Sequence, residues 1–139
     1  MRALRPALAL LLAGLLLGVL AATAGASRSP TTAEREAIRA RALNVCDRTG
    51  APSPCRYHRA RVSTRNARFA WADVTNEGFS AVLLRRPSVG SLAFRVVGVQ
   101  GGGINTCAYW RARAGRKVLR DLRVSGLLNV RTGRVGLCG

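Results

Sequence analysis

The fold is decided by residues 57–99, which read YHRARVSTRNARFAWADVTNEGFSAVLLRRPSVGSLAFRVVGV. In this stretch, β-branched and aromatic residues form four runs between short turn-forming segments. The runs cover residues 57–63, 68–74, 79–86 and 92–99. Their connections are short enough for antiparallel hairpins, whereas parallel strands need crossovers of about a dozen residues or more. The sequence therefore predicts a four-stranded antiparallel meander.

Alternation along each run predicts which side chains share a face of this sheet, because successive side chains of a strand point to opposite sides. Phe69 and Trp71 should share one face of the second strand. In the third run, Phe79, Ala81 and Leu83 should lie together.

A helix is expected before the sheet, over residues 31–46. Thr31 and Glu34 have the spacing of a capping box, and Gly50 follows the segment as a helix-ending signal. An apolar face follows at helical spacing, formed by Ile38, Ala42, Val45 and Cys46. Residues 27–30 are expected to be a short, mobile polar leader.

A second helix is predicted over residues 111–123, after the sheet. Val118, Leu119 and Leu122 would form its apolar side, although Gly115 weakens the pattern. The tail that follows could add a hairpin turning at Thr132-Gly133. The expected architecture is α+β: an N-terminal helix, a meander sheet, a second short helix and a tail.

The first 26 residues have the three parts of a secretory signal peptide. Arg2 and Arg5 precede an apolar run at residues 7–22, and small residues follow up to Ala26. The alternative is an uncleaved membrane anchor, but the run falls short of the ~20 residues that cross a bilayer as a helix. We therefore expect cleavage after Ala26 and one secreted domain over residues 27–139, extracellular or associated with the cell wall.

Four cysteines in a short exported chain predict two disulfides. They are Cys46, Cys55, Cys107 and Cys138. Closeness in sequence favours Cys46–Cys55 together with Cys107–Cys138, and a Cys55–Cys107 bond remains an alternative. The spacings lack a CxxC knuckle, so no metal site is expected.

Several short motifs follow one another along the chain between residues 55 and 122. They are RVS at 61–63, FA at 69–70, LLRR at 83–86, FRVV at 94–97, Cys107, and VLRDL at 118–122. This order resembles a group of small secreted actinobacterial proteins. The resemblance implies the α+β architecture and export, and it assigns no functional residue. The chain departs from that group by its cysteine-bearing tail after Leu122 and by three consecutive glycines at 101–103.

Charge is the strongest functional feature of the sequence. The formal net charge is +17, and it is still +15 once Arg2 and Arg5 of the expected signal peptide are removed. Such a field attracts anionic partners, which predicts association with an anionic polymer or surface. The alternative is that the charge serves solubility or reflects composition, because Lys117 is the only lysine among so many arginines.

Two patches are candidates for anion binding. The first follows the first strand and its turn and consists of Arg56, Arg59, Arg61, Arg65 and Arg68. Alternation would place Arg59 and Arg61 on one face with Tyr57 and Ser63. The second patch is the basic side of the predicted second helix, formed by Arg113, Arg116, Lys117 and Arg120.

Catalytic patterns are weak, and we expect neither an enzyme nor a cofactor. His58 is the only histidine, and no serine lies in a GxSxG context. The glycines at 98–103 lack the Lys-Ser/Thr of a phosphate-binding loop. Tyr109-Trp110 is either an exposed pair or packing over a disulfide. The alternative to polymer binding is a secreted protein-binding or inhibitor module that uses the loop at 101–106.

Overall fold

The computed structural model describes residues 26–50, 52–101, 105–129 and 134–139. All but the last residue of the expected signal peptide lies outside these ranges, as does the expected turn at Thr132-Gly133.

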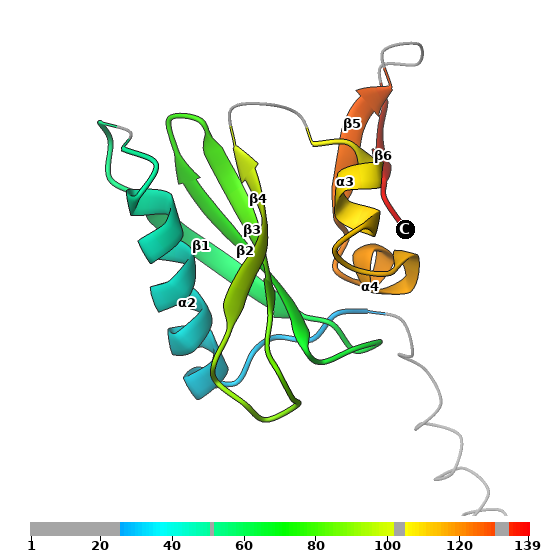
Figure 1. Cartoon of the computed structure of the whole chain (residues 1–139), viewed down its shortest axis with the longest axis horizontal. Helices are drawn as coiled ribbons and strands as arrows, with labels where there is room; N and C mark the ends of the chain where they lie inside the picture. The colour runs from blue at the N-terminus through cyan, green and yellow to red at the C-terminus, as the bar shows by residue number, and fades with distance from the viewer. Residues whose placement is uncertain (1–25, 51, 102–104, 130–133) are drawn as a thin grey trace, which may run out of the picture.

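Two antiparallel sheets and three described helices make up the fold (Figure 1). The elements are α2 (Thr32–Asp47), β1 (Arg56–Val62), β2 (Phe69–Asn76), β3 (Phe79–Arg85), β4 (Arg95–Gly101), α3 (Cys107–Arg111), α4 (Arg116–Asp121), β5 (Ser125–Asn129) and β6 (Arg134–Leu137). The main sheet has the order β1-β2-β3-β4, and β5 pairs with β6. The predicted α+β class and the four-stranded meander are confirmed.

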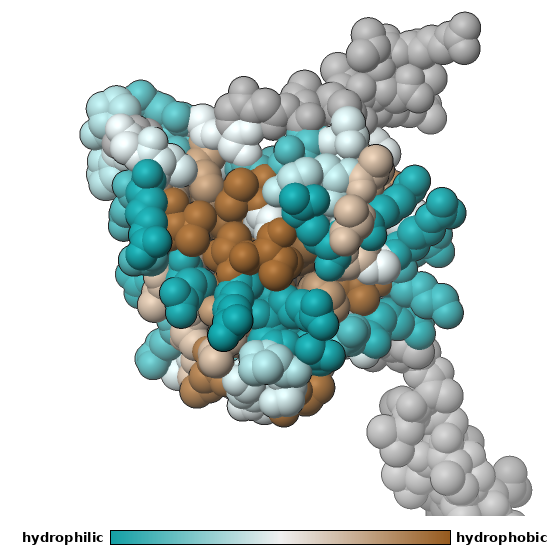
Figure 2. Space-filling view, viewed as in Figure 1, coloured by the Kyte–Doolittle hydropathy of each residue, from teal (hydrophilic) through white to brown (hydrophobic). Residues whose placement is uncertain are grey.

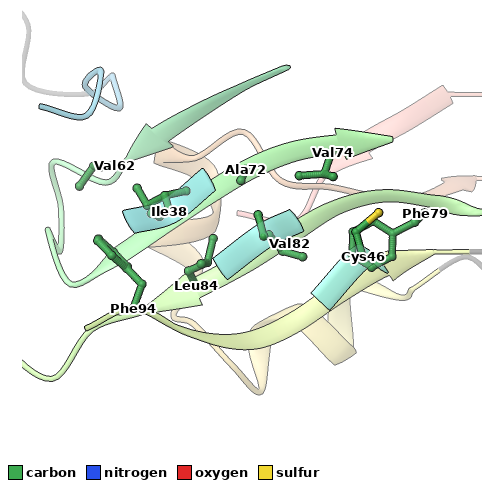
Figure 3. Packing of buried hydrophobic residues seen from close by; sticks show 11 residues of the cluster. Ile38, Cys46, Val62, Ala72, Val74, Phe79, Val82, Leu84 and Phe94 are labelled. Atoms are coloured by element: carbon green, nitrogen blue, oxygen red, sulfur yellow. The ribbon is translucent and has the colours of Figure 1, made fainter. Parts of the chain in front are cut away.

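Three layers are visible in Figure 1: α2, the main sheet, and a C-terminal unit formed by α3, α4, β5 and β6. Each face of the sheet has its own apolar cluster. Ile38, Val82 and Leu84 belong to the cluster between α2 and the sheet (Figure 3). Trp71 and Trp110 belong to the cluster between the sheet and the C-terminal unit. The sheet is thus a shared middle layer that buries side chains on both faces.

Helix α2 begins as its sequence predicts. The Thr31 hydroxyl accepts a hydrogen bond from the Glu34 N–H, and the Glu34 carboxylate accepts one from the Thr31 N–H, which completes the capping box. The leader before it is not loose, contrary to expectation. Arg28 forms two backbone hydrogen bonds of 2.9 Å with Val62, which extend the sheet beside β1.

Register shifts change which side chains share a face. His58 is an extra residue in β1 between Tyr57 and Arg59, so Tyr57 packs on the α2 side and away from Arg59. A second shift, between Phe79 and Ala81, places Phe79 in the α2 cluster. The expected groupings of Tyr57 with Arg59 and of Phe79 with Ala81 are therefore wrong, because a bulge reverses the alternation beyond it.

The predicted helix over 111–123 is wrong in its extent: only α4, Arg116–Asp121, lies within it, and the earlier helix α3, Cys107–Arg111, ends where it was expected to begin. Gly115 is the N-cap of α4, with extended backbone, and this interrupts the helical run. Helix α4 ends at Asp121 with Leu122 as its C-cap, and the next residue, Arg123, has a φ of 53°, in the left-handed region. The Arg123 N–H bonds to the Arg120 carbonyl and the Val124 N–H to the Leu119 carbonyl, the two bonds of a Schellman motif.

Trp110 attaches the C-terminal unit to the sheet. It is fully buried, its ring centroid lies 5.1 Å from that of Trp71, and it packs directly over Gly98. A Cβ at Gly98 would lie 2.6 Å from the Trp110 ring, so only glycine allows this close approach. Trp110 is consequently a packing residue and is not exposed.

The favoured disulfide pairing is confirmed. Cys46–Cys55 links the end of α2 to the chain just before β1, and Cys107–Cys138 links α3 to the C-terminus. Across the described ranges, no helix combines the length and apolarity needed to cross a membrane.

Candidate anion-binding surface

The face of the sheet opposite α2 has an apolar centre. The register places Trp71 opposite Leu83 and Leu83 opposite Gly98, and Trp110 covers this central row. The neighbouring cross-strand rows on either side of it carry arginines. Basic depressions therefore lie on both sides of the Trp110 contact.

The first depression, which we call the Arg85 groove, has a volume of about 300 Å³. It is lined by Arg68, Arg85, Arg86, Pro87, Arg95 and Val97. Arg85 and Arg95 are direct register partners in β3 and β4, so two like charges face each other across the strands. None of the described residues that line the groove is acidic.

Neighbouring groups hold the arginine side chains that line the Arg85 groove. The Arg85 guanidinium carbon lies 5.6 Å from the ring centroid of Phe69, a cation–π contact. Arg68 Nε donates a hydrogen bond of 3.1 Å to the Arg86 carbonyl. Arg95 and Arg85 are exposed, and their charges are open to a ligand.

Arg86 also lines the Arg85 groove, and its role is structural. Its side chain is only 1% exposed, and Nη1 lies 2.9 Å from Glu34 Oε1. It also donates to the carbonyls of Ala67 and Ser91. Glu34 in turn accepts two hydrogen bonds of 2.7 Å from Arg28. The charge of Arg86 is thus neutralised inside the protein.

This cluster changes the ionisation of Glu34. The hydrogen bond from Arg28 lowers the pKa of Glu34 most, and burial opposes it. The Thr31 N–H and the positive charges of Arg28 and Arg86 lower the pKa further, to about 2 from an ordinary 4.5. Glu34 therefore stays ionised at any pH at which the protein is expected to work.

A second depression of about 310 Å³ brings the two predicted patches together. Arg65 from the β1–β2 turn lies beside Lys117 and Arg120 of α4, around Asp121. Burial would raise the pKa of Asp121, but hydrogen bonds from Ser63 and from the Arg65 and Thr64 N–H groups outweigh it and lower the pKa. Asp121 thus fastens the β1–β2 turn to α4.

The third depression, the Arg61 pocket, has a volume of about 300 Å³. Arg59 and Arg61 of β1 line it together with Arg123. Asp73 of β2 lies 2.7 Å from Arg59 Nε and 3.9 Å from Arg61 Nη2, and it also accepts a hydrogen bond from Trp71 Nε1. The predicted first patch is therefore divided, with Arg59 and Arg61 in this pocket, Arg65 in the second depression and Arg68 in the Arg85 groove.

The other predicted basic residues are dispersed. Arg113 lies between α3 and α4, with its guanidinium 3.4 Å from the Tyr109 ring centroid and Nη1 bonded to the Tyr109 carbonyl. Arg116 is exposed at the start of α4, and Arg56 is exposed at the start of β1. Because the predicted long helix is interrupted, Arg113 does not share a helix face with Lys117.

Figure 2 shows hydrophobic side chains gathered on the viewed face between α2 and the C-terminal unit, with hydrophilic side chains around them. The edge strand β4 runs through this region and carries the half-buried Val96, Val97 and Val99. The Arg85 groove, which Val97 lines, therefore borders a less polar strip along the edge of the sheet.

The remaining candidates from the sequence are His58, possible metal ligands and the loop at 101–106. His58 is exposed, and its Nε2 lies 2.7 Å from the Thr75 hydroxyl. In the part of the chain that the structure describes, no three His, Cys, Asp or Glu side chains are grouped to hold a metal ion. Of the proposed recognition loop at 101–106, residues 102–104 lie outside the described ranges.

Sequence reasoning missed Arg85, Arg95 and Arg123. The first two flank the hairpin at residues 87–91 nearly symmetrically, so a correct register would have paired them. Arg123 carries no such signal, because its position depends on where α4 ends. Comparison with protein-family models, with curated proteins and with solved structures finds no match to this chain.

Proposed function

We propose that this chain is a small exported, strongly basic and non-catalytic protein that associates with anionic polymers or with a negatively charged cell surface. The observation that carries the proposal is the Arg85 groove, where Arg68, Arg85 and Arg95 surround one depression and no acidic residue lines it among those described.

The arrangement of Arg85 and Arg95 supports ligand binding over mere solubility. Like charges directly opposite each other in a sheet destabilise it, and solubility alone would be served by arginines placed apart. A polymer phosphate or carboxylate lying between the two guanidinium groups would offset their repulsion. Planar guanidinium groups suit this task because they donate paired hydrogen bonds to such anions.

The overall charge supports the same proposal. Six acidic residues in the whole chain cannot neutralise its basic side chains by any pairing. Two of the six, Glu34 and Asp73, are already bound to arginines, and the Asp121 carboxylate accepts hydrogen bonds from the β1–β2 turn. A large positive excess therefore remains at the surface, where it attracts polyanions.

Export is part of the proposal. The sequence of residues 1–26 supports it, and so do the two disulfides, because structural disulfides persist in oxidising compartments. Outside the cell, the accessible polyanions are nucleic acid, polyphosphate and acidic wall polymers.

The test uses residues 27–139 with both disulfides formed, applied to immobilised DNA and to polyphosphate at low and at moderate salt. We expect retention at low salt and release as the salt rises, because polyanion binding releases counterions. Replacing Arg68, Arg85 and Arg95 by Gln should weaken retention. The matched control replaces Arg35, Arg39 and Arg41, three exposed arginines of α2, by Gln. Equal weakening by both triple variants, or no retention at low salt, would refute the proposal.

A further inference from the structure

The Arg61 pocket combines residues from the strands of the main sheet with residues of the C-terminal unit. Arg59 and Arg61 come from β1, Asp73 from β2 and Ser80 from β3, while Arg123 follows α4. Its volume of about 300 Å³ is at the lower end of the range for small-molecule sites. The pocket is therefore large enough for a discrete anionic group.

The charges in the pocket are unbalanced. Three guanidinium groups face one carboxylate, and Asp73 already accepts hydrogen bonds from Arg59 and Trp71. No carboxylate among the described residues pairs with Arg123. About two positive charges thus remain for a ligand.

Arg61 has a donor that the protein leaves unused. Its Nε atom is buried and has no hydrogen-bond partner among the described residues. Burial lowers the pKa of Arg61, and the neighbouring charges of Arg59 and Arg123 lower it further, against the effect of Asp73. A buried, unpaired donor on a cation is costly, and a further negative charge beside the guanidinium group would offset that cost.

Arg123 occupies a backbone position at which glycine is favoured. It is the residue after the α4 C-cap, with a φ of 53°, and an L side chain is strained there. Strained residues of this kind concentrate at functional sites. Here the strained residue directs a third guanidinium toward Arg59 and Arg61.

We propose that the Arg61 pocket binds a phosphate group between the guanidinium groups of Arg59, Arg61 and Arg123. A phosphate monoester or free phosphate carries about two negative charges at neutral pH, which matches the excess in the pocket, whereas a carboxylate carries one. The proposal deepens the proposed function by giving one phosphate a discrete site, and it rests on that function only for the source of the phosphate.

The test is a titration of residues 27–139 with inorganic phosphate, followed by NMR of the arginine Nε–Hε groups, with acetate as the control anion. We expect saturable shifts at Arg61 and Arg123, with weaker effects of acetate. Arg61→Gln and Arg123→Gly should each weaken phosphate binding about tenfold or more. Arg48→Gln, which removes a charge at the C-cap of α2 on the opposite face, should leave it unchanged.

Arg123→Gly separates binding from folding, because glycine is favoured at this position and the variant should be at least as stable as the wild type. Tighter binding of tripolyphosphate than of phosphate would identify a polymer end as the source, and equal binding would identify free phosphate; both support the site. Absence of saturable shifts, or shifts unchanged in Arg123→Gly, would overturn the proposal. Failure here with the Arg85 groove still binding polyanions would leave the proposed function intact.

Discussion

The two faces of the main sheet differ in whether their charged side chains are buried and paired. On the α2 face, the charged residues Glu34 and Arg86 are buried and bound to each other, and an apolar cluster fills the rest. On the opposite face, the C-terminal unit covers the central row, and arginines flank it in depressions. The first face stabilises the fold, and the incompletely covered face leaves arginines such as Arg85 and Arg95 exposed.

The faces also differ in how they are fastened. Helix α2 precedes the sheet and packs along it through a continuous apolar stripe. The C-terminal unit is built from short elements, is attached to the sheet through Trp110 and the Asp121 hydrogen bonds, and is cross-linked internally by the Cys107–Cys138 disulfide. Loss of that disulfide should therefore matter more than loss of the other.

The largest expected effect is the loss of stability on removing the Cys107–Cys138 disulfide. Replacing Cys107 and Cys138 by alanine opens a loop of sequence separation 31 and should cost about 4 kcal/mol of unfolding free energy. Replacing Cys46 and Cys55 opens one of separation 9 and should cost about 2.5 kcal/mol. Urea unfolding of both variants, followed by tryptophan fluorescence, measures the difference. A greater loss from the Cys46/Cys55 variant would contradict the expectation that the Cys107–Cys138 disulfide contributes more to stability.

The next effect concerns the buried charges of the α2 face. Glu34→Gln leaves Arg86 buried without its counter-ion and should cost about 3 kcal/mol. The folded pKa of Glu34 is about 2, below its ordinary 4.5. Its stabilising contribution is therefore complete above pH 4.5 and is lost as the pH falls through 2.

Thermal unfolding between pH 6 and pH 2 checks this pH dependence. The wild type should lose stability in acid, and Glu34→Gln should lose less over the same interval because its side chain does not titrate. Asp47→Asn, an exposed position on the same helix, serves as the control. Parallel pH curves for the wild type and Glu34→Gln would show that Glu34 does not carry the acid response.

The smallest expected effect concerns Arg95, on the face of the main sheet opposite α2. Arg95→Thr removes one partner of the like-charge pair with Arg85 and introduces a β-branched residue at a strand position. It should stabilise the protein by up to about 1 kcal/mol while weakening polyanion binding. Urea unfolding and DNA retention measure the two quantities. A loss of stability would mean that the Arg85–Arg95 pair is not repulsive in the folded protein.

The fold follows closely from sequence where the signals are local. Apolar spacing and the Thr31–Glu34 capping box predicted α2, and short connections predicted the meander. The facing of Tyr57 and Phe79 was wrong because bulges depend on how two strands pair and leave no local mark. The predicted extent of the second helix was wrong. Gly115 has extended backbone and starts a new helix, although the apolar pattern of the sequence continues across it.

The candidate surface was less predictable, because a depression collects residues from several elements. The sequence singled out Arg65 and Lys117 in separate patches, and the fold places them side by side. Arg95 was missed because the sequence predicts a fourth strand from Leu92 whereas β4 begins at Arg95, so the register that pairs it with Arg85 was not predicted. Arg123 becomes visible only once the end of α4 is known.

In the proposed function, the face of the main sheet opposite α2 binds polyanions through its arginines. The most direct measurement is the slope of log K against log salt for DNA binding, compared between the wild type and the variant with Arg68, Arg85 and Arg95 replaced by Gln. Each lost phosphate contact should reduce the slope by about one, so we expect a reduction of about two to three. An unchanged slope in this variant would show that the Arg85 groove does not bind the polyanion.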